Sequence, residues 1–342
     1  MDRYTIQPNT SNKNQQLQLY SHDILILLDP DHILIRPITH DFTPTSTYIP
    51  KVRETSLTSS AVSSSIVENG IPFGQRYGFG GHWVDFNLTH ITSSMTSPSL
   101  RVSRKEAEEL YAVGPPYIAT VSDFYRIAQK WVEFVPRVHK EYPHLLAEMF
   151  AYCIAASHLQ LPHVVMDSLM VSDQGISKGE GWDFLEDVPA EDVCTFAAKT
   201  INRFKYNTAK EMYDDKKNRL WSSKEDLVLA QMPNVLHLCQ RYMVEEWFFG
   251  KRKVPKDYFT CESPILQTPP PNLATMYKYR IRPGDPRDQH IPLPAIQIKK
   301  STFMICAATK ALQDASTYFK SHYCTNPNMK EDLNLFELFY KK

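Results

Sequence analysis

Two carboxylates two residues apart, Asp29 and Asp31, stand in the stretch "DILILLDPDHILIRPI". Carboxylate oxygens are hard ligands of the kind that Mg²⁺ and Mn²⁺ prefer. These ions complete their coordination shells with phosphate oxygens, so a diphosphate bound beside the pair would fit the same chemistry. The spacing therefore predicts a divalent-metal site at Asp29 and Asp31.

The segment before the pair predicts a strand that positions it. Residues 24–28 are all Ile or Leu without alternation, which is typical of a strand buried on both faces in a parallel or mixed α/β sheet. Pro30 cannot donate a ladder hydrogen bond and so marks the strand's end. The carboxylates would then lie at the carboxyl end of a central strand, where open α/β sheets bind ligands. His32 follows directly, and we expect it to face solvent.

A histidine and a basic run later in the chain extend this chemistry. His237 lies in an expected strand over 233–242, and Lys251, Arg252 and Lys253 follow it. An imidazole can bind Mn²⁺, and the cations can neutralise a leaving diphosphate. A packed strand histidine and a solvated basic surface are the alternatives for these residues.

Three acidic residues are candidates for the catalytic carboxylate. Glu148 is the one acid near the start of an apolar, buried-looking helix over 144–160. It can favour the helix dipole or stabilise a cationic reaction centre. Asp167 and Asp173 are the next candidates if Glu148 does not fill this role.

Several function classes find no support. The motifs GxSxG, GxxxxGK[ST] and HExxH are absent, and the 38 basic and 38 acidic side chains leave no net charge that would indicate a nucleic-acid partner. There is no run of 18 apolar residues, and the polar N-terminus lacks the apolar region of a signal peptide.

The remaining pattern predicts alternating helices and short strands. Ser103 and Glu106 form a capping box for a helix over 104–111, and apolar spacing predicts further helices over 123–139 and 300–322. Between the first two, "VGPPYIAT" indicates a turn and a short strand. The glycine- and aromatic-rich residues 70–86 could form a loop over a ligand or a tight turn packed on the core.

The six cysteines lack the paired spacing of a zinc site. Buried thiols are one possibility. Disulfides are the other, with Cys194, Cys261 and Cys324 favoured because their flanks are polar and irregular. Sequons at Asn9 and Asn87 are compatible with passage through a secretory compartment.

Five stretches resemble the peptidyl serine α-galactosyltransferase and hydroxyproline O-arabinosyltransferase group of glycosyltransferases, closest to its algal and protist branch. They are "LLDPDHILIRPI", "VGPPYIAT", "KWVEFVPRVHKEYPHLLAEMFAYCIAASHLQLPHVVMDSLMVSD", "GEGW" and "HLCQRY…WFFGKRKVPKD". The similarity covers about residues 22–262, and the long central stretch is its most specific part.

The resemblance implies a GT-A type α/β fold with a mixed sheet, a nucleotide-sugar donor (a UDP-sugar), Mn²⁺ or Mg²⁺, and retaining transfer to a Ser or hydroxyproline hydroxyl of a secreted glycoprotein or peptide. On the matching positions, Asp29, Asp31 and His237 correspond to the metal and diphosphate site. Gly114, Pro115 and Pro116 correspond to a turn beside the donor sugar. Glu148 faces the reaction centre, and Lys251 and Arg252 fall in the basic donor-binding segment.

The chain departs from that pattern at its start. Only 28 residues precede Asp29, so we expect the nucleotide-binding half to be incomplete, with a Golgi or endoplasmic reticulum anchor in a segment absent from this chain. The expected domains are a glycosyltransferase domain over 1–262, followed by a proline-rich extended segment with a C-terminal helix over 263–342. A catalytically inactive sugar- or nucleotide-binding protein on a degenerate GT-A fold is the alternative function.

Overall fold

A computed structural model describes residues 23–44, 50–53, 64–172, 181–203, 231–276, 279–281 and 290–340. The chain divides into two compact units. Among described residues, the first unit holds 23–28, 39–44, 50–53 and 64–167, and the second holds 29–38 and everything from 168 onward. Helices and small mixed sheets alternate in both, which confirms the predicted α/β class.

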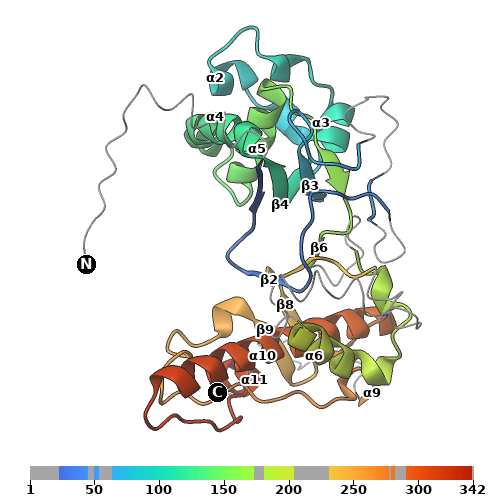
Figure 1. Cartoon of the computed structure of the whole chain (residues 1–342), viewed down its shortest axis with the longest axis vertical. Helices are drawn as coiled ribbons and strands as arrows, with labels where there is room; N and C mark the ends of the chain where they lie inside the picture. The colour runs from blue at the N-terminus through green and yellow to red at the C-terminus, as the bar shows by residue number, and fades with distance from the viewer. Residues whose placement is uncertain are drawn as a thin grey trace. The chain divides into compact units, whose positions relative to one another are not determined.

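A four-stranded sheet forms the centre of the first unit, in the order β1-β4-β3-β5 (Figure 1). Its strands are β1 (Ile24–Leu27), β3 (Phe73–Arg76), β4 (Val113–Thr120) and β5 (Val164–Met166). The pairs β1–β4 and β3–β4 are antiparallel, whereas β3–β5 is parallel, so the sheet is mixed as predicted.

The strand predicted before the carboxylate pair exists, but its burial was predicted wrongly. β1 pairs with β4 alone among the described strands, so it lies at the edge of the sheet. Leu25 and Ile26 are 43% and 37% exposed, and neighbouring strand residues point to opposite faces, so neither face is fully covered. An apolar run without alternation indicates a strand but does not determine whether that strand is central.

The expected turn in "VGPPYIAT" is instead part of β4, and all eight residues are buried. Its pairing with β3 jumps from Tyr117 opposite Gly74 to Gly114 opposite Gln75, which leaves Pro115 and Pro116 in a bulge. The bond between the two prolines is cis. Proline has no N–H to place in a ladder, and a bulge leaves residues unpaired, so the two prolines are accommodated inside a central strand.

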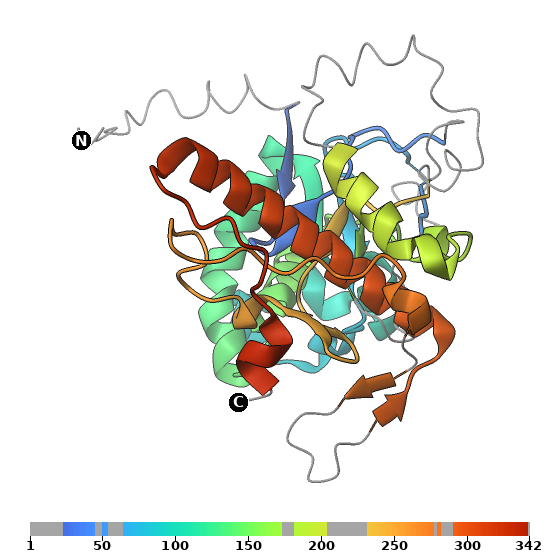
Figure 2. The same ribbon diagram turned by 90° about the horizontal axis from the view of Figure 1, so that it is seen from below.

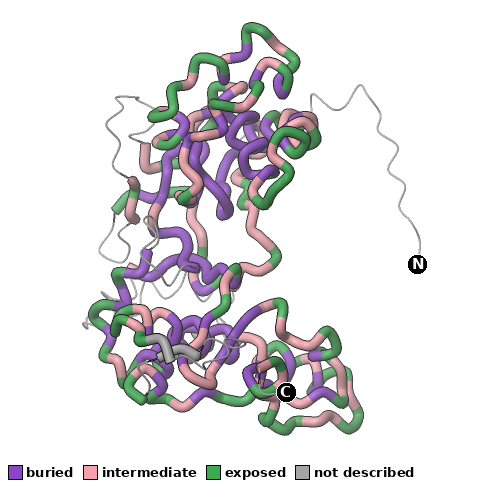
Figure 3. Tube along the Cα trace, turned by 180° about the vertical axis from the view of Figure 1, so that it is seen from behind, coloured by how far each residue is buried: buried purple, intermediate pink, exposed green. Residues whose placement is uncertain are grey.

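Three helices pack around this sheet. They are α3 (Arg104–Leu110), α4 (Val121–Glu141) and α5 (Ala147–His158). The predicted capping box of α3 is confirmed, because the Ser103 hydroxyl accepts from the Glu106 N–H and the Glu106 carboxylate accepts from the Ser103 N–H. The N-cap of α4 is Thr120 rather than Ser122 or Asp123. Nearly all of α5 is buried, and it appears purple in Figure 3.

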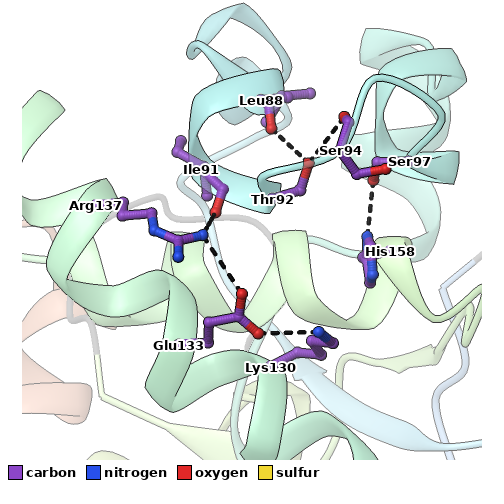
Figure 4. Close-up of polar contacts among 9 residues, drawn as sticks. All are labelled: Leu88, Ile91, Thr92, Ser94, Ser97, Lys130, Glu133, Arg137 and His158. Carbon is purple, nitrogen blue, oxygen red and sulfur yellow. Dashed lines mark hydrogen bonds and ion pairs between the residues drawn. The ribbon is translucent and has the colours of Figure 1, made fainter.

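Short elements close one side of the first unit: η2 (His82–Asp85), α2 (Leu88–Thr92) and η3 (Pro98–Arg101). Figure 4 shows how they attach to the long helices: the Arg137 Nη1 atom donates to the Ile91 carbonyl at 2.6 Å, and Ser97 Oγ lies 2.8 Å from His158 Nδ1. Glu133 holds Arg137 and Lys130 at 3.5 Å and 2.9 Å.

Within the glycine-rich residues 70–86, the part around Gly81 and Trp83 is packed on the core. Trp83 is completely buried, and a Cβ on Gly81 would overlap the backbone of α3. Phe79 and Phe86 pack on the same core. This favours the core-turn interpretation over a loop that covers a ligand.

The second unit holds a smaller sheet, in the order β2-β7-β6. β2 (His32–Leu34) is antiparallel to β7 (Val235–His237), and β6 (Met170–Val171) is parallel to β7. Two hairpin-like pairs accompany it: β8 (Arg241–Val244) with β9 (Trp247–Gly250), and β10 (Tyr279–Ile281) with β11 (His290–Pro292).

The core of the second unit forms around α10 (Ala295–Tyr323), the long orange-red helix of Figure 2. This helix contains the predicted 300–322. It packs against α6 (Val193–Arg203) and α9 (Leu273–Met276). The unit also contains α11 (Leu335–Tyr340) and the short turns η4 (Asp183–Leu185), η5 (Ala190–Asp192) and η7 (Lys251–Lys253). Since residues on both sides of position 262 belong to this unit, the expected boundary there does not coincide with the observed division.

Two disulfides lie within the second unit. Cys194–Cys306 joins α6 to α10, and Cys261–Cys324 joins the segment after η7 to the end of α10. The three favoured cysteines are all bonded, so that prediction is confirmed. Cys306 is the partner that the flanking sequence did not single out, because it lies on the buried face of a regular helix.

Within the described ranges, every helix is too short or too polar to cross a bilayer.

Candidate metal and diphosphate site

The turn between β1 and β2 carries the two carboxylates. The N–H of His32 donates to the Asp29 carbonyl at 3.0 Å, which closes the turn around Pro30. The N–H of Leu238 donates to the Asp31 carbonyl at 3.0 Å, which fixes the turn to the end of β7. The carboxylates therefore belong to the second unit and stand directly before β2.

Strand register brings His32 and His237 together. They are direct partners in the antiparallel β2–β7 pair, with ring centroids 4.6 Å apart at an interplanar angle of 75°. The hydroxyl of Tyr242 donates to the His237 carbonyl at 3.0 Å and holds the end of β7 in place. Two imidazoles thus meet beside the carboxylate turn because of a pairing between distant parts of the chain.

Asp29, His32 and His237 each present one ligand atom within 4.8 Å of the others. The His237 Nε2 atom lies 3.9 Å from Asp29 Oδ2 and 3.4 Å from Asp31 Oδ2. Two imidazole nitrogens and one carboxylate oxygen at this separation could close around a single ion. Within the described parts of the chain, this is the one group of three such side chains close enough to do so.

The polar atoms of His32 fit such an ion. Both ring nitrogens are buried, and neither has a hydrogen-bond partner in the described structure. Burial lowers the pKa of His32 to about 3, with repulsion from His237 and Lys251 adding to the effect and Asp31 opposing it. The ring is therefore neutral at pH 7 and offers a lone pair, which is the form that binds metals.

His237 is neutral for a related reason. Burial lowers its pKa, Asp31 opposes this, and Lys251 adds to it. Its side chain is 9% exposed, whereas that of Asp29 is 40% exposed. The His237 side chain is thus covered, whereas the Asp29 carboxylate is open to solvent. A further ligand could approach the site from the side of Asp29.

Asp31, which was predicted as a metal ligand, contacts Lys251 as well as His237. Its Oδ2 atom accepts a hydrogen bond from the Lys251 ammonium of η7. Burial raises the pKa of Asp31, but the bond from Lys251 and the nearby His237 and Lys251 charges outweigh it, so the pKa lies below its ordinary value. Asp31 is thus an ionised carboxylate that holds Lys251 beside the candidate metal site, and Arg252 follows on the same turn.

The other predicted site residues lie in the first unit or outside the described structure. Gly114 and Pro115 are buried in β4, and a Cβ on Gly114 would overlap the Tyr77 ring. Asp167 follows β5, with its Oδ2 atom 3.7 Å from Arg76 Nη1. Asp173 lies outside the described residues.

Glu148 is in the first turn of α5, as predicted, but its side chain is exposed. The expectation of a carboxylate enclosed by an apolar helix was therefore wrong. α5 starts at Ala147, and its buried residues surround the helix except at Glu148, which points outward where the helix begins. Its backbone carbonyl accepts from the Trp131 indole at 2.7 Å.

The sequence argument missed His32, which it expected to face solvent. The signal was its place directly after the carboxylate pair and at the start of an apolar strand.

Chemically, the assembled group can bind a divalent cation and place an ammonium next to it, which suits an anionic ligand such as a diphosphate. Comparison with protein-family models, curated proteins and solved structures found no match to this chain.

Proposed function

We propose that the chain is a metal-dependent glycosyltransferase of GT-A type, which moves a sugar from a UDP-sugar to a Ser or hydroxyproline hydroxyl of a secreted glycoprotein or peptide. The observation that carries the proposal is the group of Asp29, His32 and His237 beside the Asp31–Lys251 pair. The resemblance of the surrounding stretches to the serine galactosyltransferase and hydroxyproline arabinosyltransferase group supplies the choice of reaction. A Golgi or endoplasmic reticulum lumen is the compartment that this reaction implies, and the two disulfides are consistent with it.

Asp29, His32 and His237 would hold the metal, and Mn²⁺ suits them better than Mg²⁺. Two of the three ligand atoms are imidazole nitrogens, which later divalent ions accept more readily than Mg²⁺ does. When bound, the ion would supply Lewis-acid stabilisation of the charge on a departing diphosphate.

The chain's own charges would assist that departure. Lys251 is held next to the site by Asp31, and Arg252 follows it, so both cations can approach a diphosphate that bridges from the metal. Over the whole reaction, the bond from the anomeric carbon to the diphosphate oxygen breaks, the acceptor oxygen bonds to that carbon on the same face, and the acceptor's proton passes to the released diphosphate. Both a front-face and a covalent route agree with these roles. The catalytic carboxylate stays a prediction from the sequence: Glu148, with Asp167 and Asp173 as alternatives.

A binding protein without turnover is the second candidate. The described group could bind a metal and a diphosphate, and its two carboxylates are already assigned, Asp29 to the metal and Asp31 to Lys251. Such a protein would bind the donor and leave it intact, so binding and transfer must be measured separately.

The test combines calorimetry and an assay of sugar transfer. UDP with Mn²⁺ should stabilise the folded chain by about 2.7 kcal/mol at a concentration one hundred times the dissociation constant. His237→Ala should remove the part of this stabilisation that depends on Mn²⁺. His90→Ala, which changes an exposed histidine of the first unit, should not remove it. UDP that binds equally with and without Mn²⁺ would contradict the proposal, and binding without transfer would favour the second candidate.

A further inference from the structure

We propose that Asn87 carries an N-linked glycan in the native protein. Asn87, Leu88 and Thr89 form an N-x-T sequon, the acceptor sequence for this modification. A sequon becomes informative when the structure exposes its amide and the chain bears marks of an oxidising compartment. Both conditions hold for described parts of this chain.

The side chain of Asn87 is exposed and already oriented. It is the N-cap of α2, and its Oδ1 atom accepts from the His90 N–H at 3.1 Å. Because the oxygen faces the helix, the Nδ2 atom is directed away from it, and Nδ2 has no hydrogen-bond partner in the described structure. Glycosylation replaces one hydrogen of Nδ2 and leaves Oδ1 able to accept, so the cap and the glycan are compatible.

The segment around Asn87 is held in place from its opposite side. The Asn87 N–H donates to the Glu141 carboxylate at 2.7 Å. Leu88 and Ile91 are buried, and Figure 4 shows the Ile91 carbonyl bound by Arg137 of α4. One side of α2 is thus packed on the core, while its N-cap is left on the surface where a bulky group meets no obstruction from α2 itself.

The disulfides supply the independent observation. Cys194–Cys306 and Cys261–Cys324 indicate a chain that folds in an oxidising compartment, and N-glycosylation takes place in the same kind of compartment. There the amide nitrogen bonds to the anomeric carbon of a lipid-diphosphate-linked oligosaccharide. The bond from that carbon to the diphosphate oxygen breaks, the lipid diphosphate leaves, and one amide proton passes to a base of the transferring enzyme.

Tryptic mapping of the full-length protein from its native cells tests the proposal. Residues 77–101 lie between Arg76 and Arg101 without an internal Lys or Arg, and Asn87 is the one asparagine among them. An N-glycan amidase used in heavy-oxygen water should convert residue 87 to aspartate with one heavy oxygen, and this mark should be absent without the enzyme. Recovery of the untreated peptide with unmodified Asn87 would overturn the proposal, and so would modification of Asn9 alone.

Matched variants test the acceptor itself, in translation with microsomes and an added leader. Asn87→Asp keeps a good N-cap but cannot be glycosylated, and Thr89→Ser keeps the sequon. The first should lose the gel-mobility shift of one glycan and the second should retain it. Because mobility is read on the denatured chain, the result does not depend on folding. An unchanged shift in Asn87→Asp would contradict the assignment. None of these results depends on glycosyltransferase activity.

Discussion

The imidazoles of His32 and His237 meet edge to face across the β2–β7 pair, with ring centroids 4.6 Å apart. His32 is half-buried and His237 is buried; two neutral imidazoles gain little from each other, and the ring nitrogens of His32 have no hydrogen-bond partner among the described residues. With Asp29 beside them, both rings could bind a shared cation, which would give the His32 ring a partner.

His32→Ala should weaken Mn²⁺ binding at least about tenfold, roughly 1.4 kcal/mol, because it removes one of three proposed ligands. Leu34→Ala is the matched control, since Leu34 is an exposed residue of the same strand. Titration calorimetry with Mn²⁺ measures both. Equal affinity in the His32 variant and the wild type would remove His32 from the site.

Lys251→Met should change the affinities for Mn²⁺ and for UDP in opposite directions. Without the ammonium, Asp31 is released and the local positive charge falls, so Mn²⁺ alone should bind about tenfold more tightly, roughly 1.4 kcal/mol. UDP measured at saturating Mn²⁺ should bind about tenfold more weakly, because a cation beside the diphosphate is lost. If the variant binds both Mn²⁺ and UDP more weakly, Lys251 acts by holding the fold of the turn that carries Asp31.

Glu148→Gln should lower the rate of sugar transfer at least about a hundredfold, roughly 2.7 kcal/mol, if its charge stabilises the transition state. Its side chain is exposed, so the melting temperature should not change. Glu191→Gln, at another exposed glutamate, is the control. Full transfer activity in Glu148→Gln would assign the carboxylate role to Asp167 or Asp173 instead.

The free energy of unfolding should decrease as the pH is lowered below 6.5, because of His163. It is completely buried, with Nε2 2.9 Å from the Tyr152 hydroxyl, and burial lowers its pKa from 6.5 to about 3. Between these values the unfolded chain binds a proton that the folded chain excludes, so protons favour unfolding. From pH 6.5 to 4.5 this group alone costs about 2.3 kcal/mol.

His163→Gln keeps an acceptor for Tyr152 and cannot titrate. Urea unfolding at several pH values should therefore show a shallower loss of stability below pH 6.5 than in the wild type. The difference between the two slopes isolates His163 from the carboxylates and other histidines, which both proteins share. Parallel curves would show that His163 does not exclude the proton in the folded state.

Removing either disulfide should destabilise the chain. The bonded cysteines are separated by 112 residues in Cys194–Cys306 and by 63 in Cys261–Cys324. Loop-closure entropy gives about 4.8 and 4.3 kcal/mol for the two bonds. Paired serine substitutions followed by denaturant unfolding under non-reducing conditions measure each one. Unchanged stability in both double variants would contradict disulfides at these positions.

The sequence by itself determined the elements whose cause is local. Ser103 and Glu106 satisfy each other's backbone groups within one helical turn, so the start of α3 could be predicted to the residue. Apolar spacing likewise predicted α4 and α10, because a helix buries one face at a fixed period. α5 was predicted from its apolar residues on most faces. The carboxylate pair was also visible, since Asp29, Pro30 and Asp31 directly follow the apolar run that contains β1.

Tertiary structure decided what depends on distant partners. The run at Ile24–Leu27 fits a central or an edge strand equally well, and pairing with β4 alone left it at the edge. His32 became a direct partner of His237 only through the β2–β7 register. Asp31 was assigned to Lys251 by contacts across the second unit. Such pairings are set by how separate segments pack together, so no spacing within either segment could specify them.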